Sequence, residues 1–141
     1  MDIRQLSPDY AVSPQIDPTD AGEIAAAGYT TVICNRPDAE IPGNLQADVM
    51  RSAVEQAGLT FVVNPVVPGG MGPATLDAQA QAISAATGPV LAYCASGNRS
   101  AIVWSLLNAG SIGVDGVLAA TRAAGYDHSP FRAQFEMMTK G

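Results

Sequence analysis

The stretch VLAYCASGNRS, residues 90–100, decides the fold of this chain. An apolar strand ends at Cys94, a short loop containing Gly97 follows, and Arg99 leads into an apolar, helix-forming stretch over residues 100–109. Backbone N–H groups at a helix N-terminus and a nearby guanidinium both favour a thiolate, and they also bind oxyanions. The stretch therefore predicts a strand–loop–helix unit with an activated cysteine at its centre.

Strands and helices alternate along the rest of the chain, without internal repeats. Repeated strand–helix–strand units predict an α/β domain with a central, mainly parallel sheet flanked by helices on both faces. At 141 residues the chain is expected to form a single domain over residues 1–141. The expected strands cover 3–6, 10–12, 29–34, 60–64 and 90–93; the expected helices cover 17–28, 45–57, 75–86 and 100–138, the last with breaks near 110–111, 125 and 130.

The composition narrows the kinds of molecule that the protein is expected to bind. The formal net charge is −6, which argues against nucleic acids and anionic membranes as partners. The cysteine loop itself predicts a small anionic substrate or a thiol acceptor. Cys34 and Cys94 are the two cysteines, too few for a disulfide scaffold, and they suit a reducing cytoplasm. No Cys/His cluster or dinucleotide motif is present, so no metal or organic cofactor is implied. The sequence does not indicate an oligomeric state.

The cysteine loop resembles two families of enzymes. Cys94 and Arg99 are separated by four residues, similar to bacterial single-domain rhodaneses, whereas protein tyrosine and dual-specificity phosphatases have five. Residues 10–15, 27–33 and 36–38 look like the start of a dual-specificity-phosphatase-like domain, and residues 123–127 also fit. The combination resembles the bacterial family called beta-lactamase hydrolase-like protein, phosphatase-like domain (DUF442). The resemblance covers nearly the whole chain and implies a fold similar to that of these phosphatases.

The chemistry of the loop assigns a role to each residue. Cys94 is the expected nucleophile, and Arg99 stays charged and can bind an oxyanion with two N–H groups. The resemblance implies that the Ser100 hydroxyl assists the thiolate. The predicted catalytic residues are Cys94, Arg99 and Ser100, and the predicted anion-binding positions are Ala95, Ser96, Gly97, Asn98 and Arg36.

Hydrolysis of a phosphate ester also needs a proton for the leaving oxygen. The region that carries the acidic Asp in the phosphatases, residues 64–73, contains no carboxylate here. Asp77 is explained equally well by its place in the first turn of a helix, and Asp38 and Glu40 are interpreted as exposed turn residues. Tyr93 stands where most phosphatases have a histidine before the cysteine, and His128 is interpreted as a surface or helix-start residue.

These features favour sulfur transfer through a Cys94 persulfide, because sulfite leaves as an anion and a short loop suits a sulfur atom. The alternative is a phosphatase-type hydrolase that acts through a Cys94 phosphocysteine. A further alternative is a non-catalytic module that senses anions or redox state, in which Cys34 serves as a resolving thiol for oxidised Cys94.

Overall fold

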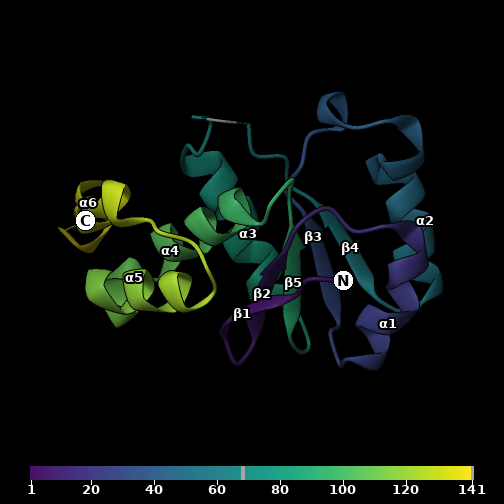
Figure 1. Ribbon diagram of the computed structural model, residues 1–141, viewed down its shortest axis with the longest axis horizontal. Coiled ribbons are helices and arrows are strands. Elements are labelled where there is room, and N and C mark those ends of the chain that lie inside the picture. Colours follow the sequence, from purple (N-terminus) through teal and green to yellow (C-terminus); the bar gives the residue numbers. More distant parts are fainter. Residues whose placement is uncertain (68, 141) are drawn as a thin grey trace.

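The computed structural model describes residues 1–67 and 69–140. A five-stranded sheet in the order β1-β2-β5-β3-β4 crosses the middle of the molecule (Figure 1). Strand β1 pairs antiparallel with β2, and the other neighbouring strands are parallel. The mainly parallel α/β sheet predicted from the sequence is therefore confirmed. The strands are β1 (Arg4–Ser7), β2 (Tyr10–Ser13), β3 (Thr31–Cys34), β4 (Thr60–Val63) and β5 (Val90–Tyr93).

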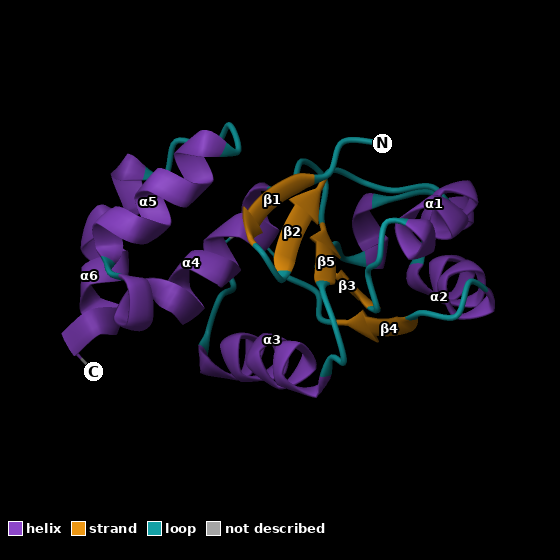
Figure 2. Cartoon of the chain, turned by 90° about the horizontal axis from the view of Figure 1, so that it is seen from below, coloured by secondary structure: helices purple, strands orange, loops and turns teal. Residues whose placement is uncertain are grey.

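Helices cover both faces of the sheet (Figure 2). α1 and α2 lie on one face, whereas α3 and α4 lie on the other, with α5 and α6 packed outside α4. No helix within residues 1–67 and 69–140 is long and apolar enough to cross a membrane. The helices are α1 (Ala21–Ala26), α2 (Ala47–Gln56), α3 (Pro73–Ala85), α4 (Asn98–Ile112), α5 (Val114–Ala123) and α6 (Arg132–Lys140).

Two helix boundaries differ from the prediction. The first helix begins as a 3₁₀ turn, Pro18–Asp20, in which Asp17 and Asp20 form a capping box before α1 starts. The break predicted near residues 110–111 is present but lies at Gly113, because α4 continues to Ile112. Gly113 ends α4 with a φ of +83°, a left-handed conformation that glycine adopts without steric cost.

The central strand β5 sets the position of the cysteine. It lies between β2 and β3, and its side chains alternate between two apolar clusters. Leu91 and Tyr93 belong to the cluster that contains the buried residues of α1 and α2. Val90 and Ala92 belong to the cluster on the face of α4–α6. Because β5 is buried on both faces and flanked by parallel strands, Cys94 emerges at the middle of the carboxyl edge of the sheet.

Candidate active site

Cys94 lies in the tight turn between β5 and α4. Its backbone N–H reaches the carbonyl of Ser13 at 3.4 Å, and its Sγ accepts the N–H of Gly97 at 3.2 Å. Gly97 has a φ of +91°, which turns this N–H towards the sulfur. The Asn98 N–H is used within the loop, where it donates to Ser96 Oγ at 3.3 Å. One of the predicted anion-binding amides therefore faces the sulfur, and another is occupied by the loop itself.

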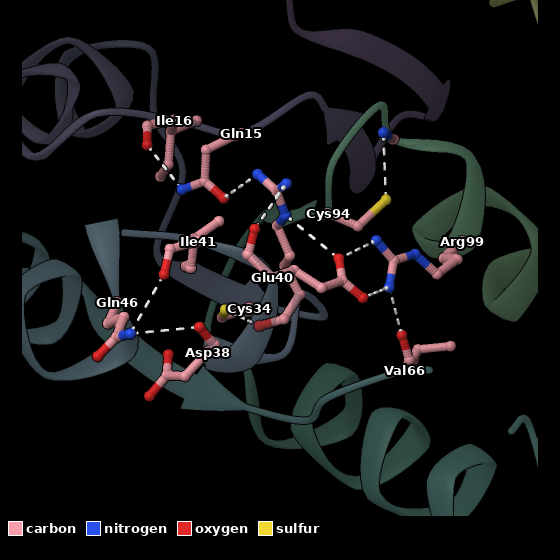
Figure 3. Close-up of polar contacts among 12 residues, drawn as sticks. Gln15, Ile16, Cys34, Asp38, Glu40, Ile41, Gln46, Val66, Cys94 and Arg99 are labelled. Carbon is pink, nitrogen blue, oxygen red and sulfur yellow. Dashed lines mark hydrogen bonds and ion pairs between the residues drawn. The ribbon is translucent and has the colours of Figure 1, made fainter. Parts of the chain in front are cut away.

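The guanidinium of Arg99 is held on two of its three edges. Nη1 and Nη2 donate to the two carboxylate oxygens of Glu40 at 2.8 and 2.7 Å, and Nη1 also donates to the carbonyl of Val66 at 2.7 Å. A guanidinium has five N–H groups, so Nε–H and one Nη2–H remain, and these two lie parallel on one edge. That edge faces Cys94 (Figure 3). Glu40 first, and to a lesser degree Cys94, raise the pKa of Arg99 above its ordinary value.

Glu40 is an exposed residue of the 3₁₀ turn Asp38–Glu40, as interpreted from the sequence, but it also pairs with Arg99. Its side chain is 29 % exposed, and its Oε1 also accepts Nε–H of Arg36 at 3.3 Å. Arg36 in turn donates to Gln15 Oε1 at 3.3 Å, so it contacts both Glu40 and Gln15. The hydrogen bonds with Arg99 and Arg36 lower the pKa of the Glu40 carboxyl. Arg36 binds the carboxylate of Glu40, and its predicted role in binding the substrate anion stays a prediction.

The other two carboxylates considered from the sequence lie elsewhere. Asp38 Oδ1 accepts the Ala47 N–H at 2.8 Å at the start of α2, where an anion stabilises the helix N-terminus. Asp77 is exposed on α3. Within the described residues, neither contacts Arg99.

Ser100 takes part in a buried polar network instead of bonding the cysteine. Its Oγ donates to Asn35 Oδ1 at 2.9 Å. Asn35 and Gln79 exchange two amide hydrogen bonds, and Gln79 also contacts Asn64 and Tyr10. All five side chains are buried. The network joins the carboxyl ends of β3 and β4 to the first turn of α4. The role of Ser100 at the thiolate stays a prediction.

Two aromatic residues from the α5–α6 connection hold the other side of the loop. Tyr126 Oη donates to the carbonyl of Ser96 at 2.8 Å, and His128 Nε2 lies 2.7 Å from Asn98 Oδ1. A Cβ added to Gly97 would collide with Tyr126 Oη. His128 is 2 % exposed, so its interpretation as a surface residue is wrong, although it does precede the 3₁₀ turn Ser129–Phe131. Burial lowers the pKa of His128 and so favours its neutral ring.

Cys34 and Cys94 are both free thiols. Cys34 pairs in register with Tyr93 and shares its apolar cluster, and its Sγ donates to the Arg36 carbonyl at 3.4 Å. The two sulfurs point towards different partners (Figure 3). Burial raises the pKa of Cys34, which disfavours the thiolate that a resolving cysteine needs. The role of Cys34 as a resolving thiol stays a prediction.

A pocket of about 610 Å³ lies beside the loop. Ser96, Asn98, Arg99 and Glu40 line its polar side. Cys94 is not among the lining residues and is 1 % exposed, so its sulfur is not open to this pocket in the structure. The volume lies within the range of small-molecule sites and exceeds what an inorganic oxyanion fills.

Comparisons with known proteins agree with this architecture. Residues 2–111 match the family described as beta-lactamase hydrolase-like protein, phosphatase-like domain. The beta-lactamase hydrolase-like protein of Xylella fastidiosa (strain Temecula1) is 31% identical over 129 residues, which are 90% of this chain and 30% of that protein. A corresponding protein of Agrobacterium fabrum is 32% identical over 87 residues, 62% of this chain and 20% of that protein. The chain thus spans less than a third of these relatives.

Solved structures show the same fold. A candidate phosphatase of Neisseria meningitidis Z2491 superposes with a TM-score of 0.87 at 34% identity, over 98% of this chain and 99% of that one. The Pseudomonas aeruginosa protein TpbA, in complex with pTyr, has a TM-score of 0.66 at 15% identity, over 99% and 88%. The fold is therefore that of the protein tyrosine and dual-specificity phosphatases, as predicted. On the family match and the curated relatives, the chain belongs to the beta-lactamase hydrolase-like protein, phosphatase-like domain family.

Proposed function

We propose that this domain hydrolyses phosphate monoesters through Cys94. The observation that carries the proposal is the free edge of the Arg99 guanidinium, whose two N–H groups face the cysteine while Glu40 and Val66 hold the other edges. Two parallel N–H donors fit two oxygens of a phosphoryl group. The likeness to the N. meningitidis candidate phosphatase supports the same reaction class.

The reaction has two steps. The Cys94 thiolate attacks phosphorus, an S–P bond forms, and the ester P–O bond breaks so that the leaving oxygen takes the electron pair and then a proton from solvent. Water then attacks the phosphocysteine, the S–P bond breaks, and phosphate leaves with the thiolate restored. Arg99 and the Gly97 N–H stabilise the charge that develops on the transferred group and on sulfur.

Sulfur transfer remains the second candidate, and one observation favours it. Glu40 is paired with two arginines, which lower the pKa of its carboxyl, so it is not a ready proton donor. Transfer from thiosulfate needs no such donor: the Cys94 thiolate attacks the outer sulfur, a new S–S bond forms, and sulfite leaves with the electron pair of the old one. A cyanide or thiolate acceptor then takes the outer sulfur from Cys94.

Two assays on the same protein test both candidates. Release of p-nitrophenol from p-nitrophenyl phosphate is expected in the wild type and is expected to fall about 10³-fold or more in Cys94→Ser. Cys34→Ser is the matched control, because it also removes one buried thiol and should keep most of the activity. Cys94-dependent thiocyanate formation from thiosulfate and cyanide, without phosphate release, would make sulfur transfer the function. Activity in neither assay would contradict both proposals.

A further inference from the structure

Besides its polar residues, which include Gln134, the pocket is lined by three large apolar side chains from separate parts of the chain, called here the apolar wall. Met71 follows β4, Ile102 lies on α4, and Phe131 ends the 3₁₀ turn before α6. Ile102 is 8 % exposed and belongs to the main apolar cluster, against which Met71 and Phe131 pack. The pocket therefore joins an oxyanion clamp to an apolar surface.

Two of the three wall residues, Ile102 and Phe131, are held by helix α4 and by aromatic neighbours. Arg99 and Ile102 are three residues apart on α4, so they project from the same side of the helix. The Phe131 ring lies edge-on to His128 at 5.7 Å and is tilted against Phe135 at 6.4 Å between centroids. Because these neighbours are themselves buried, the wall provides a preformed surface for a flat apolar group.

The charged side chains that line the pocket restrict which substrates bind against the apolar wall. Arg99 and Glu40 are the charged side chains among the described residues that line the pocket, and they pair with each other. A substrate that brings one anionic group to Arg99 is accommodated, whereas a second charge on its organic part finds no opposite partner there. Burial of an unpaired charge against apolar surface is costly.

The leaving group is restricted as well. Glu40 lines the pocket as a carboxylate that two arginines keep ionised. A phenolate, with a conjugate acid near pKa ~10, leaves without a proton donor far more readily than an alkoxide does. The site therefore suits esters of phenols better than esters of aliphatic alcohols.

We propose, on the basis of the phosphatase function proposed above, that the substrate is a phosphate monoester of an uncharged aryl group whose ring lies against Met71, Ile102 and Phe131. Nucleotides, sugar phosphates and amino-acid phosphates are poor fits, because their organic parts are polar or charged. The aryl group occupies the apolar wall while the phosphoryl group meets Arg99 and Cys94.

Steady-state kinetics with 1-naphthyl phosphate, phenyl phosphate and O-phosphotyrosine test this proposal. kcat/KM for the naphthyl ester is expected to exceed that for the phenyl ester about tenfold, because the second ring buries further apolar area. O-Phosphotyrosine, whose body carries two charges, is expected to rank below the phenyl ester. A naphthyl-to-phenyl ratio near one, or a preference for O-phosphotyrosine, would overturn the proposal.

Substitutions in the apolar wall test whether the preference for the naphthyl ester comes from these residues. Met71→Ala and Phe131→Leu should each lower the naphthyl-to-phenyl ratio to about threefold or less, with the phenyl ester changed by about twofold at most. Met137→Ala, at a side chain that is 71 % exposed on α6, is the matched control and should leave the ratio unchanged. An unaltered ratio in both wall variants, with thermal melting showing them folded, contradicts the assignment. Failure of the phosphatase function differs: none of the three esters then releases phosphate in a Cys94-dependent way, and the substrate assignment falls with it.

Discussion

The two sides of the Cys94 loop are held by contacts of opposite character. On one side Glu40, from the connection between β3 and α2, makes a charged and partly exposed pair with Arg99. On the other side Tyr126 and His128, from the connection between α5 and α6, make neutral contacts and are buried. The charged contact orients a side chain, whereas the neutral contacts fix the loop backbone. Activity should therefore depend more on the first side, and stability more on the second.

Gly97→Ala is expected to have the largest effect, because it disturbs both the N–H that faces the Cys94 sulfur and the contact of the loop with Tyr126. A Cβ there meets Tyr126 Oη, and φ is +91°. The free energy of unfolding should fall by about 2–4 kcal/mol, and phosphate release about 10²-fold.

Urea unfolding and p-nitrophenyl phosphate assays measure both quantities. Gly113→Ala is the matched control, since it has a φ of +83° and nothing within 4 Å of the added Cβ. Equal losses of stability and activity in the two variants would show that Tyr126 does not brace the loop.

Glu40→Gln tests the charged side. The amide keeps the shape but loses the charge that holds the guanidinium, so kcat/KM should fall about 10- to 100-fold. Stability should change by less than about 1 kcal/mol, because the pair is partly exposed. Glu55→Gln, which removes the exposed partner of Arg51, is the control and should leave activity unchanged. A loss of stability without a loss of activity would reverse the roles assigned to the two sides.

Tyr126→Phe removes one hydroxyl and keeps the ring. The Ser96 carbonyl then loses its donor, which should cost about 1–2 kcal/mol of unfolding free energy and only a few-fold in activity. Tyr29→Phe, at a half-buried tyrosine, serves as the control. A larger effect on kcat/KM than that of Glu40→Gln would contradict the division between the two sides.

His128→Gln is expected to have the smallest effect on stability at neutral pH. The role of His128 should become visible at acidic pH. Burial lowers the pKa of His128, although Asp127 opposes this shift. The unfolded chain therefore binds a proton first, so wild-type stability should fall as the pH drops below about 6.5 and through the folded pKa. The amide of glutamine does not titrate, so the variant should lose less stability between pH 7 and 5 in thermal melts. If the stability of the two proteins changed equally with pH, the assignment of a buried neutral ring to His128 would be wrong.

The sequence was most informative about the elements and their order. All five strands overlap the ranges predicted for them. The clearest case is the pair of central parallel strands β3 and β5, which are buried along their whole length and therefore consist of continuous apolar or β-branched runs. The break near 110–111 was misplaced because several glycines can end a helix, and only the chain path after α4 shows that Gly113 does so. The fold class was therefore predictable, and the helix ends were not.

The site was predictable only in part. For Gln79 the sequence did contain a signal. Gln79 lies between Leu76 and Ile83 on the apolar face of the helix, and a polar residue on such a face indicates a buried polar contact. Glu40 offered none: a glutamate in a polar turn is usually solvated, and its partner Arg99 is 59 residues away. Tyr126 and His128 were likewise hidden, because each meets a loop residue 30 positions earlier in the chain.

The sequence by itself determined the strand, the cysteine, the glycine turn and the arginine at residues 90–100, because neighbours in the chain set this local geometry. The tertiary structure decided which edge of the Arg99 guanidinium is free, which carboxylate orients it, and that Ser100 belongs to the buried network. These contacts join segments whose distance depends on sheet order and helix packing, and no local pattern of residues specifies them. The spacing of Cys94 and Arg99 is thus a property of the sequence, and the direction in which Arg99 presents its N–H groups is a property of the fold.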